Sequence, residues 1–241
     1  MNDAMYVAAS GMNAVQQALD NSTHNLVNSQ TPGFQSRRVV MQNFGSYLDV
    51  AEEQEDMIGA REVIAFEQGD LRQDDNPLAM AIEGEGFFMI RPREKGPTYY
   101  SRNGEFAINS KGQLATHGGY PVLDSQGGTI DVDSRKGPIR VQLDGTILQG
   151  ESEIAKLGLV QFKTADRNRL TAASETLFAA PAEVKPVAAD ATLVHQGYLE
   201  LPKYTIQGVV EMLIATRGYE TMQRTLRTLD QVQDNAIRSV S

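Results

Sequence analysis

The sequence contains no cysteine and no tryptophan, and these absences exclude several kinds of site. Without cysteine, the 241-residue chain can form no disulfide, no thiolate nucleophile and no cysteine-ligated zinc site. Aromatic residues make up only 7% of the chain, so platforms for binding or cleaving a glycan are scarce. No run of about 18 apolar residues occurs, and the sequence therefore predicts no membrane-spanning helix.

Basic charge is also scarce. The chain carries 22 Lys and Arg against 31 Asp and Glu, and its net charge of -9 argues against a nucleic-acid partner, because phosphate binding needs clustered bases. Residues 1–40 hold equal numbers of acids and bases and residues 203–241 are nearly neutral, so the negative charge lies between them. We interpret the neutral ends as surfaces that meet protein and the acidic middle as a body that faces water.

The residue types that usually catalyse reactions form no recognisable group. His24, His117 and His195 stand far apart, without the paired spacing of metal ligands. The stretch "GEGFFM" lacks the third glycine of a dinucleotide fingerprint, and no phosphate-binding loop, GxSxG or HExxH occurs. The sequence therefore predicts no catalytic residue, no cofactor, no metal and no small-molecule substrate, and a protein that is not an enzyme.

Apolar residues near the N-terminus recur at the spacing of one helix face, which predicts a helix of about 25 residues with a narrow apolar seam. Asn25 and Asn28 extend this helix, where they form either solvated surface or buried amides that set the register of packing. The residues that we expect at an assembly interface here are Met5, Met12, Val15, Leu19, Asn25, Leu26 and Asn28.

The C-terminal segment shows the same helical spacing, and its apolar stripe also needs a covering surface. One interpretation is that both helices cap the central domain; the other is that they pair with each other and with other copies of the chain. The corresponding C-terminal residues are Val209, Met212, Leu213, Tyr219, Met222, Leu226 and Leu229.

Between the helices the pattern changes to an alternation of period two, which favours short antiparallel strands. Turn dipeptides follow one another about eight residues apart, as in hairpins; they are Asn103-Gly104, Lys111-Gly112, Gly118-Gly119 and, further on, Asp144-Gly145. We expect an α+β fold with four parts: a helix and turn over 1–38, an acidic linker or extension over 39–62, an all-β antiparallel body over 63–201, and a helix over 202–241.

A sharp corner is predicted where the first helix ends, at Thr31, Pro32, Gly33 and Phe34. Proline disfavours the helical conformation of the residue before it, and glycine accepts the positive φ that such a turn requires. Two bases, Arg37 and Arg38, follow the corner.

These residues carry a resemblance to a known family. "HNLVNSQTPGFQSRR" resembles the "NNLANxxTxGFKR" signature of the bacterial flagellar rod and hook family, and "QGDLRQDDNPLAMAIEGEGFFMI" resembles its "QGxLxxTxxPLDxAIxGxGFFxV". "YYSRNGEFAINSKGQLATHGGYPVL" and "QGYLELPKYTIQGVVEMLIATRGYE" are similar to two later motifs of the same family. The motifs cover nearly the whole chain in the family's order. Length and arrangement are most similar to the proximal rod protein with a β domain; the distal rod protein is the near alternative, and a hook or hook-associated subunit a more remote one.

The resemblance implies that the terminal helices form one coiled-coil-like assembly domain, which polymerises helically in the basal body and transmits torque. It also implies export by the flagellar type III apparatus to the periplasm without a cleaved signal peptide. The expected partners are other copies of the chain and neighbouring rod proteins. The sequence departs from the family pattern in two places: Ala79 replaces an aspartate, and the stretch Leu201-Pro202-Lys203-Tyr204 replaces the usual approach to the last helix.

Overall fold

The computed structural model describes residues 2–43, 58–92, 96–189, 191–203 and 206–240. The chain divides into two compact units. Unit 1 comprises residues 1–27, 36–65 and 204–241, and unit 2 comprises residues 28–35 and 66–203. The chain therefore passes between the units at four places, which are 27/28, 35/36, 65/66 and 203/204.

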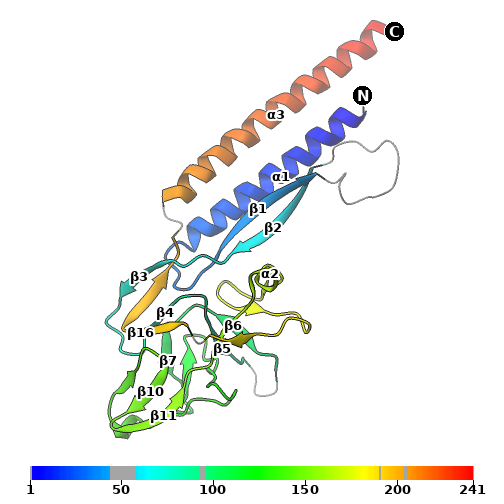
Figure 1. The fold of residues 1–241 in the computed structure, drawn as a ribbon. Coiled ribbons are helices and arrows are strands. Elements are labelled where there is room, and N and C mark those ends of the chain that lie inside the picture. Colours follow the sequence, from blue (N-terminus) through cyan, green and yellow to red (C-terminus); the bar gives the residue numbers. More distant parts are fainter. Residues whose placement is uncertain (1, 44–57, 93–95, 190, 204–205, 241) are drawn as a thin grey trace. The chain divides into compact units, whose positions relative to one another are not determined.

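Unit 1 is built from two helices and a β-hairpin (Figure 1). Its elements are α1 (Asn2–Val27), β1 (Ser36–Asn43), β2 (Ile58–Ala65) and α3 (Ile206–Val240). The strands pair antiparallel from Ser36 opposite Ala65 to Asn43 opposite Ile58, and α1 contacts α3 and both strands. The expected helices at the two ends of the chain are thus present. Within the described ranges, no helix is both long and apolar enough to cross a lipid bilayer.

The hairpin changes the interpretation of the expected linker over 39–62. Residues 39–43 and 58–62 are strand residues, since the two segments satisfy each other's main-chain groups and carry β-branched side chains suited to a strand. Their charged residues Arg61 and Glu62 are exposed; as neighbours in one strand they point to opposite faces, so both faces of β2 reach solvent there. The five acids between Asp49 and Asp56 lie outside the described residues.

Unit 2 consists mainly of short strands, every pair of which is antiparallel among the described residues. The first half contains β3 (Asp70–Gln73), β4 (Met80–Glu83), β5 (Phe87–Ile90), β6 (Tyr99–Ser101), β7 (Phe106–Ile108), β8 (Leu114–Thr116), the 3-10 helix η2 (Ser134–Lys136) and β9 (Ile139–Val141). The second half contains β10 (Thr146–Gln149), β11 (Ser152–Lys156), β12 (Leu159–Gln161), α2 (Thr164–Arg167), β13 (Thr171–Ala172), β14 (Phe178–Ala179), β15 (Val187–Ala188), β16 (Leu193–Gln196) and β17 (Tyr198–Leu201). The expected β body is therefore present, with two short helical turns that the period-two pattern did not predict.

The largest sheet of unit 2 has six strands in the order β13-β14-β6-β5-β12-β15. The order β11-β10-β9 makes a second, three-stranded sheet, and the pairs β16-β4, β17-β3 and β7-β8 complete the body. Strands far apart in the sequence thus become neighbours, as when β17 pairs with β3.

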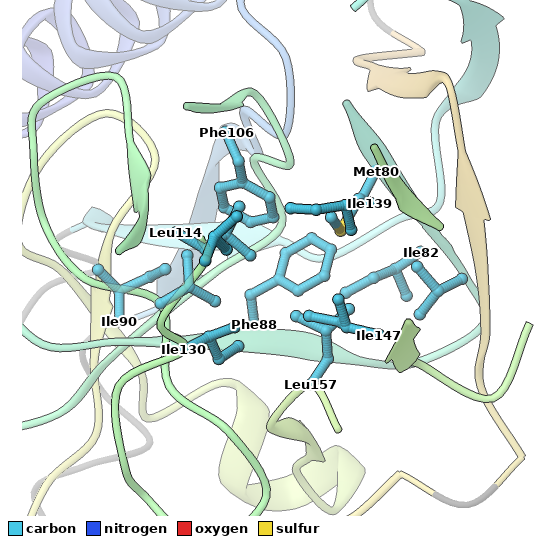
Figure 2. Packing of buried hydrophobic residues seen from close by; sticks show 13 residues of the cluster. Met80, Ile82, Phe88, Ile90, Phe106, Leu114, Ile130, Ile139, Ile147 and Leu157 are labelled. Carbon is cyan, nitrogen blue, oxygen red and sulfur yellow. The ribbon is translucent and has the colours of Figure 1, made fainter. Parts of the chain in front are cut away.

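An apolar cluster of buried side chains forms a core of unit 2 (Figure 2). Phe88 lies at its centre, with its ring 5.0 Å from that of Phe106 and nearly perpendicular to it. The other members are Met80, Ile82, Ile90, Leu114, Val122, Ile130, Val132, Ile139, Ile147, Leu157 and Val194. These residues come from β4, β5, β7, β8, β9, β10, β16 and the loops near them, so strands of several sheets meet in this cluster.

Three of the four expected turns have the backbone conformation that their glycines allow. Gly112, Gly119 and Gly145 have φ values of 78°, 79° and 83°. The expected hairpin at Asn103-Gly104 is wrong, because β6 pairs with β5 and β14 whereas β7 pairs with β8. Gly104 instead lies against main chain: a Cβ there would lie 1.5 Å from the Met80 carbonyl oxygen.

Candidate assembly interface

The helices α1 and α3 approach each other at glycines. A Cβ on Gly11 would lie 2.9 Å from Met222 Cε, and one on Gly218 would lie 3.5 Å from Val15 Cγ1. Gly11 is buried, although glycine is a poor helix former. A small residue at this position therefore lets the two helices approach closely.

The small residues of α1 are more deeply buried than the large residues of the predicted stripe. Met12, Val15, Leu19 and Leu26 are only half-buried, and the side chain of Met5 lies outside the described side chains. The buried members are Gly11, Ala14, Ser22 and Asn25. Sequence analysis missed Gly11 and Ala14 because it favoured large apolar residues, although their spacing matches one helix face as well.

The predicted stripe of α3 divides into two sets. Met212, Tyr219, Met222 and Leu226 are half-buried, and the side chain of Leu229 lies outside the described side chains. The remaining predicted residues belong to an exposed face near the start of the helix, which we call the α3 apolar patch; its members are Val209, Val210, Leu213 and Ile214. Leu213 is 55% and Ile214 65% exposed, so α3 presents a contiguous apolar surface that unit 1 does not cover.

A cavity of about 420 Å³ lies beside this patch, between α1, β1 and α3. Its lining includes Val15, Ala18, Val39 and Ala215, and Ile214 belongs to both the lining and the patch. Asn21, Ser22, Arg37, Arg38, Glu211 and Gly218 complete the lining. Unit 1 thus combines the exposed α3 apolar patch with an adjoining cavity whose lining is largely apolar.

Among the described side chains of α1, Asn25 is the most deeply buried polar one, and both ends of its amide are occupied within the chain. Its Nδ2 donates to the carbonyl oxygen of Arg37, and its Oδ1 accepts from the main-chain N–H of Arg37; both distances are 2.8 Å. Asn25 therefore ties α1 to the start of β1 in the manner of an added strand residue. Arg37 also forms an ion pair with Glu62 on β2, at 3.3 Å.

The residues of the predicted corner form a turn that belongs to unit 2. The Thr31 N–H donates to the Asn28 carbonyl oxygen at 3.0 Å, and the Phe34 N–H donates to the Thr31 carbonyl oxygen at 3.2 Å. Gly33 has φ 68°, and Phe34 is fully buried. The corner is therefore packed into the β body. Sequence analysis had instead placed the corner in one part with the first helix, residues 1–38.

Two residues that the turn contacts were also missed by sequence analysis. The Gly33 N–H donates to the Glu200 carbonyl oxygen at 2.8 Å, and the Glu200 side chain forms a buried ion pair with Arg102 at 2.8 Å. No local pattern marks this pair, because 98 residues separate its members.

The structure describes the first departure from the family pattern, Ala79, completely and the second, residues 201–204, only in part. Ala79 is completely buried, and its carbonyl oxygen accepts from the Gly197 N–H at 2.8 Å. Leu201 ends β17, and Tyr204 lies outside the described residues.

In the part of the chain that the structure describes, no three histidine or acidic side chains are arranged to hold a metal ion.

Comparison with known proteins places these features in a family. Residues 81–149 match the family described as the flagellar hook protein FlgE/F/G D1 domain. The chain is 30% identical over 245 residues to the flagellar basal-body rod protein FlgF of Rhizobium meliloti, with 100% of this chain and 98% of the relative covered. It is 28% identical over 244 residues to FlgF of Caulobacter vibrioides, covering 98% and 97%. It is 26% identical over 261 residues to the rod protein FlgG of a Buchnera aphidicola strain, covering 96% and 97%.

The similarity extends over both units, from the helices of unit 1 through the β body of unit 2. The chain belongs to the flagellar basal-body rod protein family.

Proposed function

We propose that this chain is a non-enzymatic structural subunit of the flagellar basal-body rod, in its proximal part. The observation that carries the proposal is the end-to-end similarity to proteins named as basal-body rod proteins, two of them FlgF. The exposed apolar patch on α3 supports a role in assembly, because a surface of this kind on a folded chain usually meets another protein.

The terminal helices supply the contact in this proposal. Unit 1 pairs α1 with α3 as a coiled-coil-like assembly domain, and its partner is a second copy of the chain. An apolar segment of the neighbouring copy covers the α3 apolar patch and enters the cavity beside Ile214. A contact between unlike surfaces of identical copies generates a helical filament when its rotation does not close. Such a filament transmits torque across the periplasm, because closely packed seams resist compression and shear.

The remaining parts of the proposal come from the family resemblance. The flagellar type III apparatus exports the chain without a cleaved signal peptide, and neighbouring rod proteins flank it in the periplasmic rod. No nucleic acid, lipid insertion, cofactor or small-molecule substrate is involved.

The distal rod is the second candidate position. The similarity to a protein named FlgG over 96% of this chain favours it, and both positions require the same assembly surface.

The experiment compares two leucines with the same exposure. Leu213 on α3 and Leu143 on unit 2 are each 55% exposed, so Leu→Asp at either position places a charge at a similarly solvated site. We expect Leu213→Asp to fold but to abolish rod incorporation and swimming in a strain that lacks the native gene. Leu143→Asp is the control and should assemble and swim normally.

Rods isolated from each strain are examined by electron microscopy and immunoblotting, and circular dichroism checks the fold of each variant. Normal swimming of Leu213→Asp cells would overturn the role of the α3 apolar patch in assembly.

A further inference from the structure

Three segments of unit 2 lead to the four places where the chain passes between units. The corner 28–35 lies between the passages at 27/28 and 35/36. A second segment starts at Phe66, just after the passage at 65/66, and a third segment ends at Lys203, just before the passage at 203/204. These segments are far apart in the sequence, so their relation within unit 2 must come from tertiary contacts.

Glu200 contacts all three segments. It lies on β17, three residues before the last passage. Its main-chain oxygen accepts from the Gly33 N–H of the corner at 2.8 Å. Its side-chain Oε1 accepts from the Gly69 N–H of the second segment at 2.9 Å. Glu200 thus connects the three segments through which the chain enters and leaves unit 2.

Arg102 fixes the side chain of Glu200. Its Nε donates to Glu200 Oε2 at 2.8 Å, and its Nη1 donates to the carbonyl oxygens of Gly84 and Gly86 at 3.0 and 3.1 Å. The two side chains are only 5% and 1% exposed. Because desolvating an ion pair is costly, a buried pair is weak support for stability alone and is better understood as a device that specifies geometry.

Glycines bring the segments close enough for these contacts. A Cβ on Gly33 would lie 2.1 Å from the Asn103 nitrogen, and one on Gly69 would lie 1.9 Å from the Leu201 oxygen. Both obstacles are main-chain atoms, which cannot rotate away as the end of a long side chain can. Any other residue at these positions must therefore displace main chain.

We propose that the Arg102–Glu200 pair is a mechanical joint that locks the three segments together. Force that reaches unit 2 through one passage is shared among all of them, so no single connection carries the load of rotation. Arg102 and Glu200 act as positioning residues in this role. The mechanical part rests on the proposed function as a rod subunit, whereas the coupling of the segments does not.

The substitution Glu200→Gln tests the coupling with minimal change of shape. The carboxylate offers an acceptor oxygen to both Gly69 and Arg102, but glutamine offers only one, and its NH₂ group must face the other donor. One contact is lost, and the Arg102 charge is left without a compensating charge in a buried site. The matched control is Arg169→Met, which breaks the exposed Arg169–Glu183 pair of the same unit, 2.6 Å long.

Hydrogen exchange of the purified full-length chain is the first readout. In Glu200→Gln we expect the amides of Gly33 and Gly69 to exchange at least about tenfold faster than in the native chain. The Leu114 amide, bonded to Ile130 in the core at 2.9 Å, should keep its rate, and Arg169→Met should leave all three rates unchanged. If only one of the two amides accelerates, or neither does, the joint is overturned; equal acceleration of Leu114 in the folded variant overturns it as well.

Gly33→Ala is the second variant, for the case that Glu200→Gln fails to fold. It forces the corner away from residues 102–103 and leaves both members of the ion pair intact. Coupling requires that the Gly69 amide also exchanges faster in Gly33→Ala; an unchanged Gly69 rate overturns the joint.

Swimming at increasing medium viscosity is the second readout. Cells with Glu200→Gln should assemble rods and swim in dilute buffer but stop at a lower viscosity than cells with the native chain or Arg169→Met. Equal swimming at every viscosity, despite faster exchange, overturns the mechanical role. If the native chain itself restores no swimming, the rod function is wrong, and hydrogen exchange still decides whether the segments are coupled.

Discussion

The Asn25 side chain on α1 and the Arg37 main chain on β1 are joined by two hydrogen bonds of 2.8 Å each. One side-chain amide thus takes the place of a strand partner and connects the first helix to the hairpin. Because Asn25 is almost completely buried, water cannot replace these bonds if the amide is removed. Asn25 therefore contributes two buried hydrogen bonds to the attachment of the helix to the hairpin in unit 1.

Asn25→Ala should destabilise unit 1 by about 1–3 kcal/mol, because it leaves the Arg37 N–H and carbonyl oxygen unsatisfied. Asn25→Asp should also destabilise it, since a carboxylate cannot donate to the carbonyl oxygen. Thermal unfolding followed by the helical signal at 222 nm measures both effects. Asn13→Ala, at an exposed position of the same helix, is the control, and an equal loss there would contradict a specific role for Asn25.

Gly11 should tolerate alanine but not leucine. An alanine Cβ would meet only the flexible end of Met222, at 2.9 Å, and alanine favours the helix over glycine by about 1 kcal/mol. Gly11→Ala is therefore expected to be neutral or slightly stabilising. Gly11→Leu should cost about 1–3 kcal/mol through overpacking of the contact between α1 and α3. Helical unfolding curves distinguish the two, and a harmless leucine would show that the helices need no close approach here.

Phe34→Ala should destabilise the β body rather than the helices. Phe34 is 2% exposed within unit 2, and truncation of a buried phenylalanine costs about 3–5 kcal/mol. We expect the strand signal near 218 nm to melt at a lower temperature. Val27→Ala, at a position of α1 that is 76% exposed, should leave that signal unchanged; an equal shift in the control would argue against the corner as part of the body.

Asp144 should contribute to stability at neutral pH and lose this contribution in acid. The N–H and the hydroxyl of Thr146 donate to the Asp144 carboxylate at 3.1 and 2.9 Å, respectively. These two hydrogen bonds, the one from the N–H more than the one from the hydroxyl, hold the pKa of Asp144 below its ordinary value of 3.8. Because the folded-state pKa is the lower one, stabilisation is present above pH 3.8 and disappears as the pH falls through the folded-state value. Asp144→Asn should therefore be less stable than the native chain at pH 7, and the difference should shrink below about pH 4.

Urea unfolding at a series of pH values measures this difference. The control is Asp75→Asn, which changes an exposed acid of the same unit. A difference between Asp144→Asn and the native chain that stays constant down to pH 2 would contradict the assigned hydrogen bonds.

The sequence alone located the elements whose signals are local. The apolar spacing predicted the helices that the structure describes as α1 and α3, and glycine-containing turns predicted the conformation at Gly112 and Gly145. Both signals depend on residues a few positions apart, which the chain's own periodicity determines. The motifs quoted from the sequence also led to the family to which the chain belongs.

Tertiary structure decided which side chains these elements bury and which strands they join. Periodicity could not show that α1 meets α3 at Gly11 rather than through its larger side chains, because burial depends on the partner helix. It also could not show that Asn103-Gly104 connects strands of different sheets, or that Arg102 meets Glu200. Contacts between residues far apart in the sequence leave no local pattern, and only the folded chain brings them together.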